Sequence, residues 1–307
     1  MARRVELAII GGGPAGLAAG LYAARARVGV VLLERLGLGG QILLTDWVEN
    51  YPGFPNGLSG YDLVENLKNH AAKFGLLVET AEVKRLHIGR PHRLETDGGE
   101  LEAWAVIIAS GASPNRLGVP GEEDLIGRGV SFCATCDGPF FRGQTVAVVG
   151  GGDTAVGEAI YLTRFVEKAY LIHRRDELRA AAVLQERLLG NPKVEVLWNS
   201  VVEAIEGQGG VEAVRLRHVK TEEKRRLPVN GVFIWIGVRP NLNFLAPGEL
   251  ERDQWGFLTT DGETRTSVPG LFVAGDARSK ALRQIANAVG EGAVAAYQAK
   301  EYLEGLG

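Results

Sequence analysis

The apolar residues of this chain fall into short runs that end at glycine-rich turns, and two of these turns share one pattern. The run Val5–Ile10 predicts a buried strand, the GGGPAG segment Gly11–Gly16 a turn, and the alanine- and leucine-rich residues after it a helix. Downstream, Gln144–Gly150 predicts a strand, followed by a GGGDTA turn and an amphipathic helix from Asp153 to about Phe165. Strands that alternate with helices in this way indicate an α/β fold with parallel sheets.

The first turn has the features of a phosphate-binding loop. Glycines let the backbone approach a pyrophosphate closely, and the start of the next helix offers unpaired N–H groups and a partial positive charge. A second predicted strand, VGVVLLE, ends at Glu34, 18 residues beyond Gly16 (34 − 16). Near this spacing a carboxylate accepts hydrogen bonds from ribose hydroxyl groups. The segment therefore predicts a site for an adenine dinucleotide with an unmodified ribose.

The strand after the second turn ends differently. Here KAYLI is followed by His173, Arg174 and Arg175, with Arg179 one helical turn further on. Guanidinium groups bind a 2′-phosphate through charge-assisted, often bidentate hydrogen bonds, whereas a carboxylate would repel it. The segment therefore predicts a preference for NADPH over NADH. The alternative interpretation of HRRDELR is a solvated, charge-rich start of a helix.

Two dinucleotide sites in one chain are explained if one binds FAD and the other binds the nicotinamide cofactor that reduces it. The apolar segments Val106–Asn115 and Val232–Asn241 predict strands ending in glycine, where the chain would leave and re-enter the first domain. The segment Leu271–Gln284 predicts a strand that leads Asp276 into the N-terminus of a helix. There the carboxylate would bind ribityl hydroxyls or order water on the pyrophosphate, or serve as a plain N-cap.

Composition and charge narrow the class of protein. The 307 residues are 46% hydrophobic and 23% charged, with a formal net charge of −3. This balance predicts a globular chain of two domains, without bulk attraction to nucleic acid or membranes. No apolar run reaches the roughly 18 residues of a membrane span, so a cytoplasmic location is expected.

Both cysteines of the chain lie in one short segment, CATCD, as Cys133 and Cys136 followed directly by Asp137. Zinc needs about four ligands, and the next histidine after the pair is His173, so no metal site is predicted. A pair at i and i+3 can close and reopen a small disulfide ring, and such a couple accepts two electrons, as a flavin delivers. Asp137 is then the expected proton donor and acceptor for the thiol chemistry. Two alternatives remain: Asp137 is a turn former, and the two cysteines are unreactive thiols.

Seven motifs, in this order along the chain, resemble those of the low-molecular-weight thioredoxin reductases of the flavin disulfide-reductase superfamily. They are GGGPAG, GGQ at Gly39–Gln41, VENYPGF at Val48–Phe54, CATCD at Cys133–Asp137, GGGDTA, HRRDELR at His173–Arg179 and GDA…RQ at Gly275–Gln284. The similarity runs through nearly the whole chain. Three positions depart from the family pattern: Gly157 replaces a glutamate, Ser110 replaces a threonine, and Trp47 precedes VENYPG.

The resemblance implies two Rossmann-like domains, with an NADPH-binding domain inserted into a discontinuous FAD-binding domain. The FAD domain would comprise about residues 1–116 and 242–307, and the NADPH domain about 117–241, joined by connections near Asn115 and Asn241 about which the domains rotate. Electrons would pass from NADPH through FAD and the Cys133–Cys136 disulfide to thioredoxin. The family pattern makes Cys136 the flavin-proximal sulfur and Cys133 the one that attacks thioredoxin, and it implies a homodimer.

The expected ligands of the two cofactors follow from the motifs. For FAD they are Gly11, Gly13, Pro14, Ala15, Gly16, Glu34, Gly40, Gln41, Asn50, Gly275, Asp276, Arg283 and Gln284. For NADPH they are Gly150, Gly152, Asp153, Thr154, Ala155, His173, Arg174, Arg175 and Arg179. Three other functions remain open at this point: a disulfide reductase for another partner, such as a peroxiredoxin, a ferredoxin-driven reductase, and a flavin redox sensor without turnover.

Overall fold

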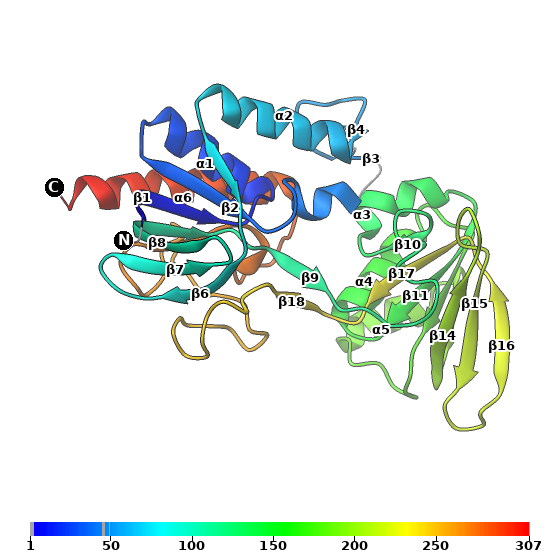
Figure 1. Cartoon of the computed structure of the whole chain (residues 1–307). Helices are drawn as coiled ribbons and strands as arrows, with labels where there is room; N and C mark the ends of the chain where they lie inside the picture. Colours follow the sequence, from blue (N-terminus) through cyan, green and yellow to red (C-terminus); the bar gives the residue numbers. More distant parts are fainter. Residues whose placement is uncertain (1–2, 45–46, 49, 307) are drawn as a thin grey trace. The chain divides into compact units, whose positions relative to one another are not determined.

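The computed structural model describes residues 3–44, 47–48 and 50–306, and the chain divides into two compact units. Unit 1 comprises Met1–Ser113 and Arg239–Gly307, and unit 2 comprises Pro114–Val238. Both units combine helices with largely parallel sheets, so the predicted α/β fold class is confirmed (Figure 1). Which cofactor each unit binds stays a prediction.

A seven-stranded sheet forms the centre of unit 1, in the order β5-β2-β1-β8-β7-β6, with β19 also paired to β8. The first half of β8 pairs antiparallel with β7, while its second half pairs parallel with β19. The strands are β1 (Arg3–Ile10), β2 (Val30–Glu34), β5 (Leu77–Thr80), β6 (Val83–His87), β7 (His92–Thr96), β8 (Gly99–Ile108) and β19 (Leu271–Val273). A separate antiparallel pair joins β3 (Trp47–Val48) to β4 (Leu58–Ser59).

Both faces of this sheet are covered, which explains why its strands read as nearly continuous apolar runs. Along β1, Leu7 and Ile9 face one core cluster while Ala8 and Ile10 face the other. The first cluster packs under α1 (Pro14–Arg25) and α6 (Ile285–Glu304), which lie side by side in Figure 1, and α2 (Gly60–Lys73) packs on α1. The second cluster packs under apolar side chains of the segment 242–258.

Unit 2 contains a five-stranded parallel sheet in the order β10-β17-β11-β12-β13 and a three-stranded antiparallel sheet, β14-β15-β16. The parallel strands are β10 (Val130–Ser131), β11 (Thr145–Gly150), β12 (Lys168–Ile172), β13 (Val194–Leu197) and β17 (Gly231–Trp235). The antiparallel strands are β14 (Ser200–Glu206), β15 (Ala213–His218) and β16 (Lys224–Pro228). The α-helices are α3 (Ala134–Asp137), α4 (Asp153–Leu162) and α5 (Ala182–Leu189), and η2 (Gly138–Phe141) is a 3₁₀ turn.

The predicted strands Val106–Asn115 and Val232–Asn241 are each divided in two. The first consists of the end of β8 and the short strand β9 (Ala112–Pro114), and the second of the end of β17 and β18 (Val238–Pro240). The breaks contain Gly111 at φ +69° and Gly237 at φ +108°, a backbone conformation that favours glycine. β9 and β18 pair with each other as a two-stranded ribbon.

Two predicted helix boundaries are wrong. The helix α4 ends at Leu162 rather than near Phe165, because the N–H groups of the next three residues, 163 to 165, donate to carbonyls three positions back instead of four. Asp276 does not enter a long helix: it lies in a single 3₁₀ turn, η3 (Gly275–Ala277), and α6 begins only at Ile285. Asp276 is also not the N-cap of η3, since Ala274 occupies that position.

Candidate redox and dinucleotide sites

The first glycine loop joins β1 to α1 in a form that suits a pyrophosphate. Gly11 has φ +106°, and a side chain at Gly16 would place its Cβ 1.9 Å from Gly11 O, so both positions require glycine. Among the described residues, no atom lies within 4 Å of a Cβ built on Gly13, and no side chain caps α1, which begins at Pro14. The N–H groups of the first helical turn therefore have no side-chain acceptor in that part of the chain, as an anion site requires.

Glu34 at the end of β2 is fixed beside this loop. Its Oε2 accepts a hydrogen bond from Gly12 N at 2.7 Å, and its Oε1 accepts one from Leu36 N at 3.0 Å. An ionised carboxylate has about four acceptor positions, so each oxygen keeps one for a further donor. Glu34 can therefore accept from a ribose hydroxyl pair without giving up its structural contacts.

Several predicted FAD ligands that are distant in sequence are brought together in unit 1. Gly40 lies against the first loop, since its built Cβ would be 3.4 Å from Gly13 Cα. The Asn50 amide donates to Gln284 Oε1 at 3.1 Å, across 234 positions of sequence, and the Gln41 amide donates to Ala112 O. The Arg283 guanidinium stacks on the ring of Phe257, 4.0 Å from its centroid.

Two buried polar atoms lie at the carboxyl edge of the same sheet. β1, β8 and β19 are parallel neighbours, and Gly11, Ser110 and Asp276 follow their carboxyl ends. Among the described residues, Ser110 Oγ is buried without a hydrogen-bond partner, and the buried Asp276 Oδ1 has an ion-pair contact, 3.2 Å from Lys280 Nζ, but no regular hydrogen bond. Buried polar atoms are nearly always paired, and ligands of open α/β sheets bind at this edge. These atoms and the open glycine loop fit a bound dinucleotide such as FAD.

The second glycine loop, between β11 and α4, has the same character. Within the described part of the chain, a Cβ at Gly152 would meet no atom within 4 Å, and no side chain caps α4. Asp153 Oδ1 accepts a hydrogen bond from Ala181 N at 2.7 Å, which fixes the start of α4 to the chain that follows the arginine segment. Thr154 is exposed beside it, whereas Ala155 is buried in the unit 2 core.

His173 differs from its predicted position as a phosphate ligand. Its ring is buried, with Nδ1 2.8 Å from Gly150 O and Nε2 2.9 Å from Glu177 O, so both nitrogens face backbone carbonyls. A Cβ at Gly151 would lie 2.2 Å from the ring, which therefore sits directly under the glycine loop. His173 connects the glycine loop to the arginine segment, which assigns it a positioning role.

The guanidinium groups of Arg174, Arg175 and Arg179 are exposed, and none forms an ion pair with any residue that the structure describes. The neighbouring Asp176 carboxylate, in contrast, is 2.6 Å from Lys220 Nζ, which holds the pKa of Asp176 below its usual value. The backbone of this segment is tied to the glycine loop, because Arg179 N donates to Gly151 O at 2.8 Å. Three unpaired cations on a fixed segment beside a phosphate-type loop suit a dinucleotide that carries an extra phosphate.

Cys133 and Cys136 form a disulfide at the short helix α3 in unit 2. The Cys133 sulfur accepts a hydrogen bond from Cys136 N at 3.2 Å and lies 3.3 Å from Thr135 Oγ1. The Ser131 hydroxyl donates to Asp137 Oδ2 at 2.5 Å, and Ser131 Oγ accepts from Cys133 N at 3.1 Å. Ser131 thus fixes the aspartate relative to the pair, a role that the motif alone did not indicate.

Gly157 occupies the interior of α4, and a Cβ built there would have no atom of the described residues within 4 Å. Burial raises the pKa of the adjacent Glu158 carboxyl. Because glycine in a helix interior costs about 0.5–1 kcal/mol relative to alanine, Gly157→Ala should stabilise unit 2 by that amount. At roughly 2–4 °C per kcal/mol, the thermal midpoint should rise by about 1–4 °C in scanning calorimetry.

The matched control for that substitution is Gly16→Ala in α1, which should lower the midpoint, because its methyl group would lie 1.9 Å from Gly11 O. A lower midpoint for Gly157→Ala would contradict the open space at Gly157.

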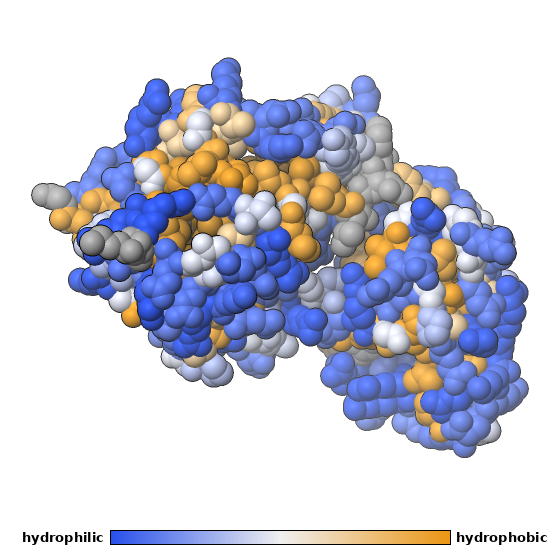
Figure 2. Space-filling view, in the orientation of Figure 1, coloured by the Kyte–Doolittle hydropathy of each residue, from blue (hydrophilic) through white to orange (hydrophobic). Residues whose placement is uncertain are grey.

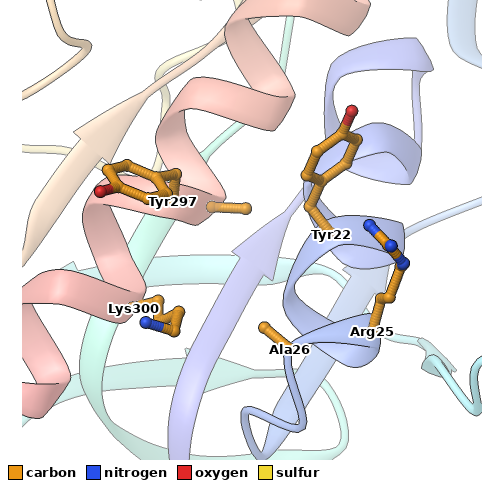
Figure 3. A pocket seen from close by; sticks show the side chains of 6 residues that line it. Tyr22, Arg25, Ala26, Tyr297 and Lys300 are labelled. Atoms are coloured by element: carbon orange, nitrogen blue, oxygen red, sulfur yellow. The ribbon is translucent and has the colours of Figure 1, made fainter.

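Other features of the described residues do not add to these sites. No three or more His, Cys, Asp or Glu side chains cluster there in a way that could hold a metal ion. No helix in that part of the chain is long and apolar enough to cross a membrane. A hollow of about 250 Å³ lies between α1 and α6, with Tyr22, Arg25, Tyr297 and Lys300 on its walls (Figure 3).

Two dinucleotide-type loops and a disulfide in one chain define the class of the pyridine nucleotide-disulphide oxidoreductases. The sequence profile with that description matches residues 5–292. Thioredoxin reductase from Treponema pallidum is 44% identical over 304 residues, covering 98% of each chain, and that from Bacillus subtilis is 44% identical over 303 residues, covering 98% of this chain and 95% of the relative. The crystal structure of thioredoxin reductase from Streptococcus pyogenes superimposes with a TM-score of 0.93 at 44% identity, covering 99% of this chain and all of the other. The chain therefore belongs to this class and, within it, to the low-molecular-weight thioredoxin reductase family.

Proposed function

We propose that this protein is a thioredoxin-disulfide reductase that transfers electrons from NADPH, through FAD bound by unit 1, to the Cys133–Cys136 disulfide and on to thioredoxin. The observation that carries the proposal is the pair of uncapped glycine loops in a chain whose two cysteines form one disulfide. Family membership supports the same reaction. The unpaired arginine segment supports NADPH as the nucleotide of unit 2.

The residues of unit 1 fit FAD, which when bound accepts a hydride from the reduced nicotinamide and delivers two electrons to a disulfide. The backbone of Gly11–Gly16 would hold the pyrophosphate, and Glu34 would accept from the ribose hydroxyls. Asp276 would accept from hydroxyl groups nearer the flavin, with Asn50, Gln284 and the Gly40–Gln41 backbone around the rest of the site.

The cysteine pair performs the exchange with the protein substrate. Reduction breaks the S–S bond with two electrons and two protons, and leaves two thiols. The Cys133 thiolate attacks one sulfur of the thioredoxin disulfide and forms a mixed disulfide with it. The other thioredoxin sulfur leaves as a thiolate. Cys136 then attacks the Cys133 sulfur, re-forms the original disulfide and releases reduced thioredoxin. Asp137, held by Ser131, donates and accepts the protons.

Anaerobic stopped-flow mixing tests the proposal. NADPH should bleach the flavin absorbance of the purified protein rapidly, and oxidised thioredoxin should restore it. A flavin sensor would show no rapid bleaching, and a ferredoxin-driven reductase would be bleached by reduced ferredoxin rather than by NADPH. Bleaching without reoxidation by thioredoxin, but with reoxidation by a peroxiredoxin, would assign the enzyme to another partner.

We also propose a homodimer in the cytoplasm, where thiols are kept reduced. A candidate contact surface is the face formed by α1 and α6, over which apolar residues gather in Figure 2. Tyr297 of α6 is 57% exposed and Tyr22 of α1 is 48% exposed. Exposed apolar patches of this kind are typical of subunit interfaces.

Light scattering at micromolar concentration should therefore give twice the chain mass of 32.9 kDa. Tyr297→Glu should shift the protein toward the monomer, because the interface would bury a charge. Tyr61→Glu, at an exposed position on α2, is the control and should leave the mass unchanged. A stable monomer for the unaltered protein would contradict the proposed dimer.

A further inference from the structure

A buried cluster of charges lies beside the η3 turn of unit 1, and none of the expected cofactor ligands except Asp276 belongs to it. Glu291 of α6 stands at its centre, with Oε1 3.0 Å from Arg278 Nη1 and Oε2 3.1 Å from Lys280 Nζ. Lys280 Nζ also lies 3.2 Å from Asp276 Oδ1. One ammonium group is therefore shared by two carboxylates.

Glu291 fixes the turn that carries Asp276. Its Oε2 accepts a hydrogen bond from Gly275 N at 2.8 Å, directly before Asp276. Arg278, on the other side of Glu291, donates through Nε to Thr260 Oγ1 at 2.6 Å. The backbone of η3 and both cations are thus held by one side chain from α6.

The exposure of the side chains differs within the cluster. The side chains of Lys280 and Glu291 are only 8% and 9% exposed, whereas that of Asp276 is 33% exposed. Asp276 Oδ1 is nevertheless buried, and among the described residues it makes no regular hydrogen bond despite its closeness to Lys280 Nζ. The exposed part of the Asp276 side chain is therefore the remainder, which includes Oδ2.

Electrostatics makes Lys280 necessary for this arrangement. Without its ammonium group, the carboxylates of Asp276 and Glu291 would lose the cation that they share, and Arg278 would remain on Glu291 alone. Two carboxylates with no cation between them repel each other, so the Asp276 side chain would turn outward. Stability alone does not account for Lys280, because buried ion pairs are often no more stabilising than well-packed apolar side chains.

We propose that Lys280 is a positioning residue for the FAD site. Its ammonium group, fixed by Glu291, holds the inner oxygen of the ionised Asp276 and leaves the outer oxygen as an acceptor for hydroxyl groups of FAD. This inference rests on the proposed function, specifically on FAD bound by unit 1. It adds Lys280 and Glu291 to the residues that determine FAD affinity, although neither needs to touch the cofactor.

A double-mutant cycle between Lys280 and Asp276 tests the proposal. FAD fluoresces more strongly in solution than when it is stacked in a protein, so serial dilution of purified holoenzyme gives the Kd from the released fluorescence. Asp276→Asn and Lys280→Met should each raise the Kd for FAD on the order of ten-fold, the loss expected for one charge-assisted hydrogen bond. The double variant should bind FAD no more weakly than Asp276→Asn alone.

Two further variants separate positioning from folding. Lys280→Arg keeps the charge and should restore most of the affinity, while Lys68→Met removes a surface ion pair with Glu65 on α2 and should leave the Kd unchanged. If Lys280→Met does not yield folded protein, Lys280→Gln, which keeps a hydrogen-bond donor but loses the charge, replaces it in the cycle.

The outcomes distinguish the positioning role of Lys280 from the binding of FAD by unit 1. The positioning role would be overturned if Lys280→Met lowered the affinity for FAD equally in the unaltered chain and in Asp276→Asn. An unchanged Kd for FAD in Lys280→Met would overturn it as well. An unchanged Kd in Asp276→Asn would instead overturn the assignment of Asp276 to the FAD site. Holoenzyme that cannot be obtained from the unaltered chain would overturn the proposed function itself.

Discussion

Replacing Cys136 with serine is expected to abolish reduction of thioredoxin while NADPH still bleaches the flavin. The chain has only two cysteines, and they form one disulfide, so no other sulfur can replace the lost one. A serine oxygen cannot form the disulfide that carries two electrons between flavin and substrate. The test measures thioredoxin turnover and, separately, the anaerobic bleaching of the flavin by NADPH in the same preparation.

Ser131→Ala is a useful comparison for the cysteine variant. It removes the hydroxyl that donates to Asp137 Oδ2 but leaves both sulfurs, so its turnover should be lowered rather than abolished. Turnover of Cys136→Ser near the rate of the unaltered enzyme would exclude the proposed electron path. Loss of flavin bleaching in that variant would show that the substitution damages the cofactor sites instead.

Replacing Arg174 and Arg175 with glutamine should lower kcat/KM for NADPH on the order of 10²-fold or more and hardly change that for NADH. Both side chains are exposed and have no ion-pair partner among the described residues, so their removal leaves no buried charge unpaired. Each charge-assisted hydrogen bond to a 2′-phosphate contributes roughly 1.5–3 kcal/mol, and NADH lacks that phosphate. Raised salt should likewise weaken the use of NADPH more than that of NADH.

Steady-state kinetics with both nucleotides checks this expectation. Arg225→Gln is the control, because it removes an exposed guanidinium of unit 2 from β16, outside the arginine segment. Equal losses for NADPH and NADH would mean that Arg174 and Arg175 support the fold or the shared part of the nucleotide. An unaltered enzyme that prefers NADH would refute the interpretation of the segment.

The structure also changes what His173 is expected to do. In the sequence it stands at the head of a charged segment and is a reasonable phosphate ligand. In the fold its ring is covered by Gly151 and packs edge-on against Trp198, with both nitrogens facing backbone carbonyls. The sequence around His173 does not indicate that Gly151, 22 positions earlier (173 − 151), lies against its ring. The burial of His173 depends on how the whole of unit 2 folds.

The local parts of both dinucleotide sites can be predicted from the amino-acid sequence. The apolar strand, the glycine turn and the uncapped helix start are set by residues within one short stretch, so Gly11–Gly16 and Gly150–Ala155 were recognisable as loops. The same is true of the cysteine pair, because residues at i and i+3 are close in almost any turn. The fold class follows from these repeated units, whereas the end of α4 depends on the change in backbone hydrogen bonding after Leu162.

The distant residues that complete the sites become apparent only in the folded chain. Glu291 reaches the turn that carries Asp276 because α6 runs back along the sheet, and Asn50 meets Gln284 across 234 positions. Ser110 and Asp276 are neighbours because β8 and β19 pair in parallel, which no local pattern indicates. The physical reason is that local preferences depend on backbone sterics and capping over a few residues. Ion pairs and buried contacts depend on strand order and helix packing, which involve the whole of unit 1.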